Sequence, residues 1–365
     1  VDPYGLTEAD THWQANDEYT PKILENISLF SPGYRGAHFK KENTILPTLI
    51  EKLWDARDDA KINENKALDQ AIKIIMNSFY GVMGTPGCRF FDFRLPSSIT
   101  LRGHSIMNQT RILIEEKGFE VIYGDTDSLF VWIKHSPSNE EANTIGKDLA
   151  RHVTLWWNTH LQKQYQLDSA LELEYENHYS KFLMPTVRGS NQGTKKRYAG
   201  LIEYKNEPHR LIFKGLETVR TDWTVIAREF QKSLYERIFL NKPYKEFIRQ
   251  TVKEIREGQH DQKLVFRKRL RRKLADYQKN IPPHVQAAKK ADDWLQKQGR
   301  APRYQNRGWI EYVYSTSGPE PLECQISPLD YDIYLERQIA PIVDGIVTFL
   351  GDSYAEITSG QMNLI

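Results

Sequence analysis

Tyr123-Gly124-Asp125-Thr126-Asp127-Ser128 forms a Gly/Asp turn between two runs of β-branched and aromatic residues, 119–123 and 128–133. Such runs around a short turn predict a β-hairpin. Residues i and i+2 of an extended segment point to one face, about 6–7 Å apart, so Asp125 and Asp127 are expected side by side. Two carboxylates on one face repel each other, and a hard divalent cation such as Mg²⁺ would neutralise them with oxygen ligands.

The turn also allows a simpler interpretation. Asp and Gly are favoured turn residues, so a bare Gly-Asp-x-Asp string is typical of a polar hairpin turn. The flanking Tyr123 and Ser128 and the hydrophobic runs on both sides make the longer string more specific. Under the functional interpretation, Gly124 removes a side chain at a point where a substrate backbone approaches.

Two helices are predicted before the hairpin. Apolar residues recur at helical spacing from Ile45, and this helix is expected to end near 63–65. The second helix carries Leu68, Ile72, Ile75 and Phe79 on one stripe and is expected to end at Gly81. The polar link between the two is short, which predicts an antiparallel helical hairpin.

The remaining chain predicts an α+β fold. Helices are expected at 97–117 and 140–165, followed by strands at 170–176, 181–187, 197–204 and 210–214. From Trp223 the pattern is mostly helical, at 223–240, 244–257, 284–298 and 329–358, with a loop around Gly308 and Gly318. The expected order is therefore a helical hairpin, a mixed region with an antiparallel sheet, and a helical tail.

Composition excludes several classes of protein. The 365 residues hold 50 Lys and Arg against 48 Asp and Glu, which excludes a uniformly basic or acidic protein. The only cysteines are Cys88 and Cys324, so a disulfide scaffold and a cysteine zinc site are excluded, and a reducing cytoplasm is favoured. No stretch approaches the ~18 apolar residues that a membrane helix needs.

The basic residues are concentrated in two blocks, 188–220 and 262–273, and the second contains no acid. Tyr198, Phe213 and Phe266 are interleaved with them. A solvated helix face is an equal alternative for 262–273 taken alone. Two blocks with aromatic residues favour a surface for a polyanion such as nucleic acid.

Cations also occur at helical spacing in the predicted helical hairpin. Arg57 and Lys61 are four residues apart, as are Lys73 and Asn77, so each pair lies on one face of its helix. Two facing helices can thus present three cations and an amide to one anion, such as a nucleoside triphosphate. Ordinary solvent-facing residues are the alternative.

Four motifs resemble those of the family B DNA polymerases. The string at 123–128 is similar to the family's motif C, and Lys73-Ile-Ile-Met-Asn77-Ser-Phe-Tyr80-Gly81 is similar to its motif B. Lys196-Arg197-Tyr198 resembles the Lys-x-Tyr motif, and Lys214-Gly-Leu-Glu-Thr-Val-Arg220 resembles the Lys-Gly segment before the thumb. The chain is therefore identified as a member of this family, most similar to its bacterial branch.

This resemblance implies a right-hand polymerase fold. Its parts would be an antiparallel palm sheet over 1–42 and 84–222, helical-hairpin fingers over 43–83, and a mostly helical thumb over 223–365. The implied reaction is template-directed DNA synthesis, in which the primer 3′-hydroxyl attacks the α-phosphorus of a dNTP at a site with two Mg²⁺ ions. The implied partners are primer-template DNA, dNTP and, through the C-terminal tail, a sliding clamp, with no membrane. DNA replication and repair in the bacterial cytoplasm, at the nucleoid, are the implied setting.

The resemblance also assigns residues. Asp127 and Asp125 would be the catalytic carboxylates and metal ligands; Glu176 would lie near the metals, with a solvent-facing row of Glu172, Glu174 and Glu176 as the alternative. Those that would bind the nucleotide are Arg57, Lys61, Lys73, Asn77 and Tyr80, with Tyr80 at the nascent base pair and the sugar. Those that would bind DNA are Lys195, Lys196, Arg197, Tyr198, Lys214, Arg220, Arg267, Lys268, Arg269, Arg271 and Arg272. Strand alternation would place Lys196 and Tyr198 on one face of the sheet and Arg197 on the other.

The family's motif A, Asp-x-x-Ser-Leu-Tyr-Pro-Ser, is not found in this sequence. We expect the chain to be a piece of a longer polymerase, cut downstream of motif A and lacking the exonuclease domain. Because two-metal catalysis needs carboxylates from more than one strand, the piece alone is expected to be inactive. Two alternatives stay open: a non-catalytic DNA-binding module and an unrelated Mg²⁺-dependent phosphohydrolase.

Overall fold

The computed structural model describes residues 30–34, 38–41, 45–135, 137–185, 196–205, 207–279 and 281–359. The chain divides into two compact units, Val1–Glu176 and Asn177–Ile365. Each unit is described by itself. Both combine helices with small antiparallel sheets, which confirms the predicted α+β class.

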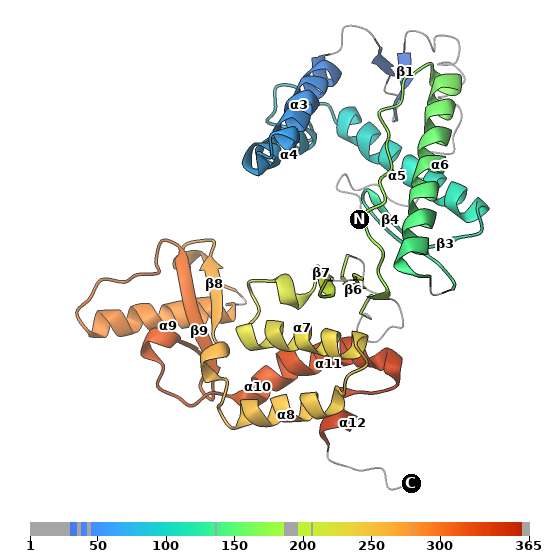
Figure 1. Ribbon diagram of the computed structural model, residues 1–365. Helices are drawn as coiled ribbons and strands as arrows, with labels where there is room; N and C mark the ends of the chain where they lie inside the picture. Colours follow the sequence, from blue (N-terminus) through green and yellow to red (C-terminus); the bar gives the residue numbers. More distant parts are fainter. Residues whose placement is uncertain are drawn as a thin grey trace. The chain divides into compact units, whose positions relative to one another are not determined.

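The first unit begins with a short strand pair and a helical hairpin. Strand β1 (Phe30–Pro32) pairs with β2 (His38–Lys40). Helices α3 (Ile45–Ile62) and α4 (Lys66–Met83) then lie side by side, which confirms the predicted helical hairpin (Figure 1). The Asn65 side chain caps α4 by accepting from the Leu68 amide at 3.1 Å, and the helix runs two residues beyond the expected end at Gly81.

The predicted β-hairpin is confirmed and shares a core with two long helices. It consists of β3 (Glu120–Asp125) and β4 (Ser128–Trp132), and its helices are α5 (Arg94–Glu116) and α6 (Asn139–Tyr165). The core between these elements includes four buried residues, which are Leu113, Ile114, Val153 and Trp157. The Trp157 indole donates to the Thr110 hydroxyl at 3.0 Å, so the long helices are also joined by a buried hydrogen bond.

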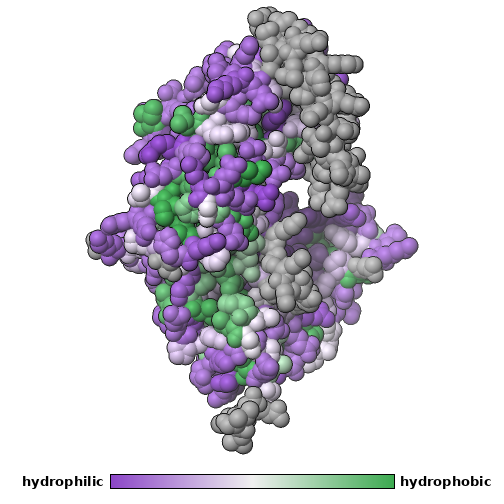
Figure 2. All heavy atoms as spheres, turned by 90° about the vertical axis from the view of Figure 1, so that its right-hand side faces the viewer, coloured by the Kyte–Doolittle hydropathy of each residue, from purple (hydrophilic) through white to green (hydrophobic). Residues whose placement is uncertain are grey.

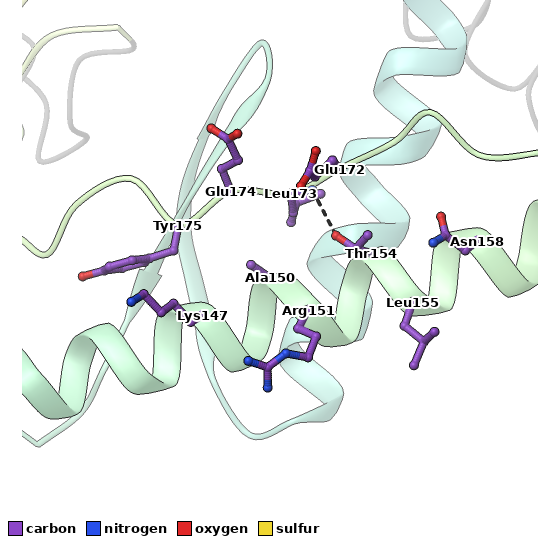
Figure 3. Close-up of a pocket in the computed structure, with 10 residues that line it drawn as sticks. All are labelled: Lys147, Ala150, Arg151, Thr154, Leu155, Asn158, Glu172, Leu173, Glu174 and Tyr175. Atoms are coloured by element: carbon purple, nitrogen blue, oxygen red, sulfur yellow. Dashed lines mark hydrogen bonds between the residues drawn. The ribbon is translucent and has the colours of Figure 1, made fainter. Parts of the chain in front are cut away.

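The strand predicted at 170–176 is absent. The segment keeps the predicted alternation, with its glutamates exposed and Leu171, Leu173 and Tyr175 partly buried. Its neighbour is helix α6 instead of a strand: the Leu173 amide donates to the Thr154 hydroxyl at 3.0 Å, and Tyr175 lies along α6 while Glu174 points away (Figure 3). The alternation in sequence therefore reflects which side of the segment packs against the protein. A β-ladder also needs a partner strand, and no strand among the described residues pairs with this segment.

In the second unit, a three-stranded sheet packs on a cluster of helices. Its strands, in the order β5-β6-β7, are β5 (Lys181–Leu183), β6 (Tyr198–Ile202) and β7 (Arg210–Lys214). The helices are α7 (Val225–Phe239), α8 (Lys245–Arg256), α10 (Tyr331–Tyr334), α11 (Ala340–Val347) and α12 (Tyr354–Thr358). One core joins sheet and helices through residues such as Leu201, Phe230, Leu234 and Val343. The predicted helix at 329–358 is thus several short helices, with a π-helical turn at Leu335–Ile339.

The second unit also contains a sheet that the sequence did not predict. Strands β8 (Phe266–Leu270), β9 (Gly308–Ser315) and β10 (Gly318–Pro321) form it in the order β10-β9-β8, and α9 (Pro283–Lys297) packs against it. The alternative of a solvated helix face at 262–273 is therefore excluded, and the loop expected around Gly308 and Gly318 is wrong. The dense charge of β8 hides its period of two, in which Phe266 and Leu270 face inward and Arg267 and Arg269 outward.

Polar residues cover most of the face seen in Figure 2, with smaller apolar areas between them. None of the helices among the described residues combines the length and the apolar composition needed to span a bilayer.

Candidate active site and DNA-binding surface

The two aspartates of the candidate active site lie at the tip of the β3-β4 hairpin. Asp125 pairs with Ser128 across the ladder, which leaves Thr126 and Asp127 as the turn. Thr126 has a φ of 50°, so the backbone reverses between the aspartates and the expected extended i, i+2 arrangement is wrong. Asp127 is exposed and accepts from the Ser128 hydroxyl at 3.2 Å, while partly buried Asp125 accepts from the Thr126 hydroxyl at 3.2 Å.

Gly124 has a packing role that the sequence did not suggest. A Cβ at this position would lie 3.2 Å from Leu129 Cδ2 and 4.0 Å from Met107 Cε on α5. The direction of the absent side chain is thus toward the protein's own apolar residues. The glycine thus leaves room for the side chain of Leu129, its cross-strand partner in β4.

The oxygen ligands at this tip suit a hard divalent cation, but all of them come from a single turn. Asp125 and Asp127 offer carboxylate oxygens, with hydroxyl groups beside them and no nitrogen or sulfur ligand in the turn. Within the described ranges, no three His, Cys, Asp or Glu side chains come together as a metal-binding group. Glu176 is therefore not assembled with the aspartates here, and its assignment stays a prediction.

In the helical hairpin, the predicted triphosphate clamp is partly occupied by acids of the chain itself. The Arg57 Nε lies 2.7 Å from Asp69 Oδ1 on the facing helix, and Lys61 Nζ lies 3.0 Å from Asp58 Oδ1. Lys73 and Asn77 are exposed and have no hydrogen-bond or ion-pair partner among the described residues. An incoming anion would meet Lys73 and Asn77 directly but would compete with Asp69 for Arg57.

The α3-α4 hairpin arranges these candidate nucleotide-binding residues along the length of its helices. Arg57 of α3 pairs with Asp69 of α4, so the two lie at the same height in the hairpin. Lys73 lies one turn, about 6 Å, further along α4. Tyr80 lies nearer the end of α4, where its hydroxyl shares a 2.6 Å hydrogen bond with Thr100 of α5. Tyr80 is thus partly buried and joins the helical hairpin to the helix that supports the aspartates.

Two of the sequence motifs meet in the sheet of the second unit. The ladder pairs Tyr198 of β6 with Lys214 of β7. Gly215 has a φ of 62°, and a Cβ there would lie 2.1 Å from the Lys196 carbonyl oxygen. Lys196 itself has a φ of 62° and precedes the strand, so the predicted strand alternation does not extend to it. Lys195 lies outside the described residues.

Behind these motifs is a buried polar network. Arg197 forms an ion pair with Glu217, whose other oxygen accepts from Gln231 Nε2 at 2.7 Å. The Gln231 carbonyl oxygen in turn accepts from the Thr218 amide at 2.8 Å. Tyr198 is buried too, with its ring 5.2 Å from that of Phe182. Arg197 and Tyr198 are therefore parts of the fold as well as candidate DNA contacts, and nothing in the sequence pattern pointed to Gln231.

Asp222 is a further residue that the sequence analysis missed. It accepts from Arg220 at 3.0 and 2.9 Å and from Lys268 Nζ at 3.0 Å, so one carboxylate holds two of the predicted DNA-binding cations. The hydrogen bonds from Arg220, and then those from Lys268, keep the pKa of this carboxyl well below its usual range. Its stabilising contribution is therefore present at neutral pH and is lost only in strong acid.

The cations of the second basic block are mostly exposed. Arg267 and Arg269 lie on the outer face of β8, followed by exposed Arg271 and Arg272. Lys214 is exposed at the end of β7. The structure thus places cations from both basic blocks on the surface of one unit.

Comparison with known proteins decides the family. The sequence profile of DNA polymerase family B matches residues 7–350. The chain belongs to DNA polymerase family B. It is 54% identical to DNA polymerase II of Escherichia coli (strain K12) over 364 residues, which cover 100% of this chain and 45% of that protein.

More distant members of family B match as well. The chain is 31% identical to a DNA polymerase of Pyrococcus glycovorans, with 84% of this chain and 39% of that protein covered. It is 29% identical to the DNA polymerase delta catalytic subunit of Plasmodium falciparum, with 90% and 31% covered. The chain therefore spans less than half the length of these curated relatives.

Proposed function

We propose that the protein containing this chain performs template-directed DNA synthesis. The observation that carries the proposal is the Asp125-Thr126-Asp127 tip, in which Asp127 is exposed and Asp125 partly buried, in a chain of DNA polymerase family B. A carboxylate tip of this kind suits phosphoryl transfer, in which charge on phosphate oxygens has to be stabilised. The reaction would join a dNTP to a primer 3′-hydroxyl and release pyrophosphate.

Each candidate residue has a role in this proposal. Asp127 and Asp125 would hold divalent metal, which we take to be Mg²⁺ because both are hard oxygen ligands; bound metal supplies Lewis-acid stabilisation and lowers the pKa of the attacking hydroxyl. Lys73 and Asn77 would bind the triphosphate, joined by Arg57 and Lys61. Tyr80, held by Thr100, would border the nascent base pair.

The second unit would hold the primer-template duplex. Its exposed cations offer donors to phosphates, and such contacts position a duplex without reading its sequence. That property suits an enzyme that copies any sequence. The contacts would come from exposed groups such as Lys196, Lys214, Arg269, Arg271 and Arg272.

The finer assignments are also proposals. Fingers over 43–83, palm over 1–42 and 84–222, and thumb over 223–365 follow the resemblance. A sliding clamp as partner, a role in replication and repair, and a cytoplasmic, nucleoid-associated location rest on the resemblance alone.

Two other functions make different predictions. A non-catalytic DNA-binding module would bind DNA without incorporating nucleotide, and it has no use for the two aspartates at the hairpin tip. A Mg²⁺-dependent phosphohydrolase would release phosphate without template, and it has no use for the basic surface of the second unit. Primer extension by the longer protein, with hydrolysis measured in parallel, separates all three.

We predict that this chain alone incorporates no nucleotide at any Mg²⁺ concentration. The aspartates share one turn, and no third candidate ligand joins them within the described residues. Bridging ligands from an opposite strand are needed to hold two metals at about 3.5–4 Å. A primer-extension gel with the purified chain checks this; template-dependent extension would show that another carboxylate, with Glu176 the first suspect, completes the site.

We predict further that the chain binds primed duplex DNA without sequence preference and with a steep salt dependence. Phosphate contacts release counterions, so the affinity should fall by about 10³-fold or more between 50 and 200 mM salt if six phosphates are contacted. Fluorescence anisotropy on two unrelated duplexes measures both properties. If the affinity for DNA does not change with salt concentration, the basic surface is not the DNA-binding surface.

A further inference from the structure

A hollow of about 350 Å³ lies beside strand β9 of the second unit. Trp309, Tyr304 and Leu322 contribute its apolar lining, and Arg267 and Arg303 contribute guanidinium groups. Its size is at the lower end of the range for small-ligand sites. None of the motifs of the sequence analysis includes its aromatic residues.

The hollow has a rigid base. The backbone amides of Arg303 and Tyr304 both donate to the buried Asp292 carboxylate, at 2.7 and 2.9 Å. The Tyr304 hydroxyl donates to Glu323 at 2.9 Å, and burial together with this bond raises its pKa to about 12. Tyr304 therefore stays neutral at physiological pH, and its side chain is held in place in the wall of the hollow.

Trp309 is the exposed aromatic residue of this site. It remains 50% exposed because it lies on the outer face of the sheet with Arg269, whereas Ile310 and Tyr312 pack with α9 on the other face. The Arg267 guanidinium lies 5.0 Å from the ring centre, and Arg269 is its direct cross-strand partner. An exposed indole with one guanidinium over its ring and a second arginine opposite it in the ladder has the composition of a stacking platform for bases, where cation–π contacts add to the stacking.

The two arginines of the hollow are matched by Glu311 and Glu323, and it is the charge of the adjoining strand that favours a nucleic acid over a protein as occupant. Glu311 lies 3.8 Å from Arg267 and Glu323 lies 3.5 Å from Arg303, distances at which both guanidinium groups keep donors for a further anion. The strand with Arg267 and Arg269 continues into exposed Arg271, Arg272 and Lys273, and no acid interrupts residues 262–273. A chain of phosphates can follow this run, whereas a protein surface would have to be strongly acidic.

We infer that this hollow binds an unpaired nucleotide of single-stranded DNA, with the base stacked on Trp309 and the adjoining phosphates at the arginines. The inference rests on the proposed DNA binding, and it adds a base contact to a surface otherwise assigned to phosphates. A base in a duplex is already stacked on its neighbours, so the site selects single strands.

The test measures the affinity of the 365-residue chain for two probes, a single-stranded oligonucleotide and the same length of abasic strand. The abasic strand keeps every phosphate and lacks the bases. Trp309→Ala should weaken binding of the normal strand about tenfold, the effect of losing one stacked base, and leave binding of the abasic strand unchanged. Trp309→Phe should retain most of the affinity, because its ring also stacks.

The matched control is Trp54→Ala on α3, since Trp54 is 48% exposed but lies in the other unit. It should bind both strands like the unsubstituted chain. If Trp309→Ala changes neither affinity or weakens both strands equally, the stacking site is overturned while salt-dependent duplex binding leaves the proposed function standing. If the unsubstituted chain binds no DNA of any kind, both proposals fall.

Discussion

Asp127→Asn in the longer protein is expected to reduce nucleotide incorporation by at least about a thousandfold, with the affinity for DNA almost unchanged. The change removes one carboxylate oxygen and one negative charge from the exposed hairpin tip but keeps the shape of the side chain. Lewis-acid stabilisation by metal is worth several kcal/mol, and each 1.36 kcal/mol is a factor of ten in rate. Because the Asp127 side chain is exposed and its hydrogen bond comes from the neighbouring Ser128 hydroxyl, the fold should not suffer.

Single-turnover incorporation and anisotropy on the same primed duplex measure the two quantities. Asp168→Asn is a suitable control, because Asp168 is an exposed aspartate of the same unit that follows the end of α6 and is not part of the hairpin. It should leave both quantities unchanged. Incorporation by Asp127→Asn at the rate of the unsubstituted protein would remove Asp127 from the metal site.

Gly215→Ala is expected to destabilise the second unit by about 3 kcal/mol or more. A left-handed backbone costs an alanine about 1–2 kcal/mol, and forcing an extra methyl group into a packed position typically costs a further ~1–3 kcal/mol. The new Cβ would lie 2.1 Å from the Lys196 carbonyl oxygen, a backbone atom that can move only with its chain. The Lys196 turn and the start of β6 would therefore have to shift.

Native-state hydrogen exchange of the β6 and α7 amides measures this effect within the unit, without requiring the whole chain to unfold in one step. Gly299→Ala is the matched control: Gly299 has a φ of 69°, and no atom lies within 4 Å of the position that the new methyl group would take. It should cost only the ~1–2 kcal/mol of the left-handed backbone. Equal losses for the two variants would show that contact with Lys196 does not constrain Gly215.

Local patterns were enough to predict the elements that carry the aspartates and the candidate triphosphate-binding residues. The β3-β4 hairpin follows from a Gly/Asp turn between β-forming runs, and the α3-α4 hairpin follows from apolar residues at helical spacing. In each case the two partners are neighbours in sequence. Short links leave them few other ways to bury their apolar sides, so sequence and structure agree.

Patterns that depend on distant partners were misinterpreted. Strand β8 pairs with β9, about forty residues away, and its arginine-rich sequence is also typical of a solvated helix face, so no strand was predicted there. The segment 170–176 shows the opposite error, because its alternation arises from packing on α6 and not from a ladder. A β-strand forms only by hydrogen bonding to a partner strand, and the strand's own sequence does not show which distant segment that partner is.

The sequence by itself determined the family, the hairpin turn that carries the two aspartates and the positions of the basic blocks, since each is a property of residues close together in the chain. Only the tertiary structure decided how those residues are held. Arg57 forms an ion pair with Asp69, and Glu217 and Gln231 are buried behind Arg197. Asp222 accepts hydrogen bonds from both Arg220 and Lys268. Such pairings depend on distances between side chains from different elements, and those distances exist only once the elements have packed together.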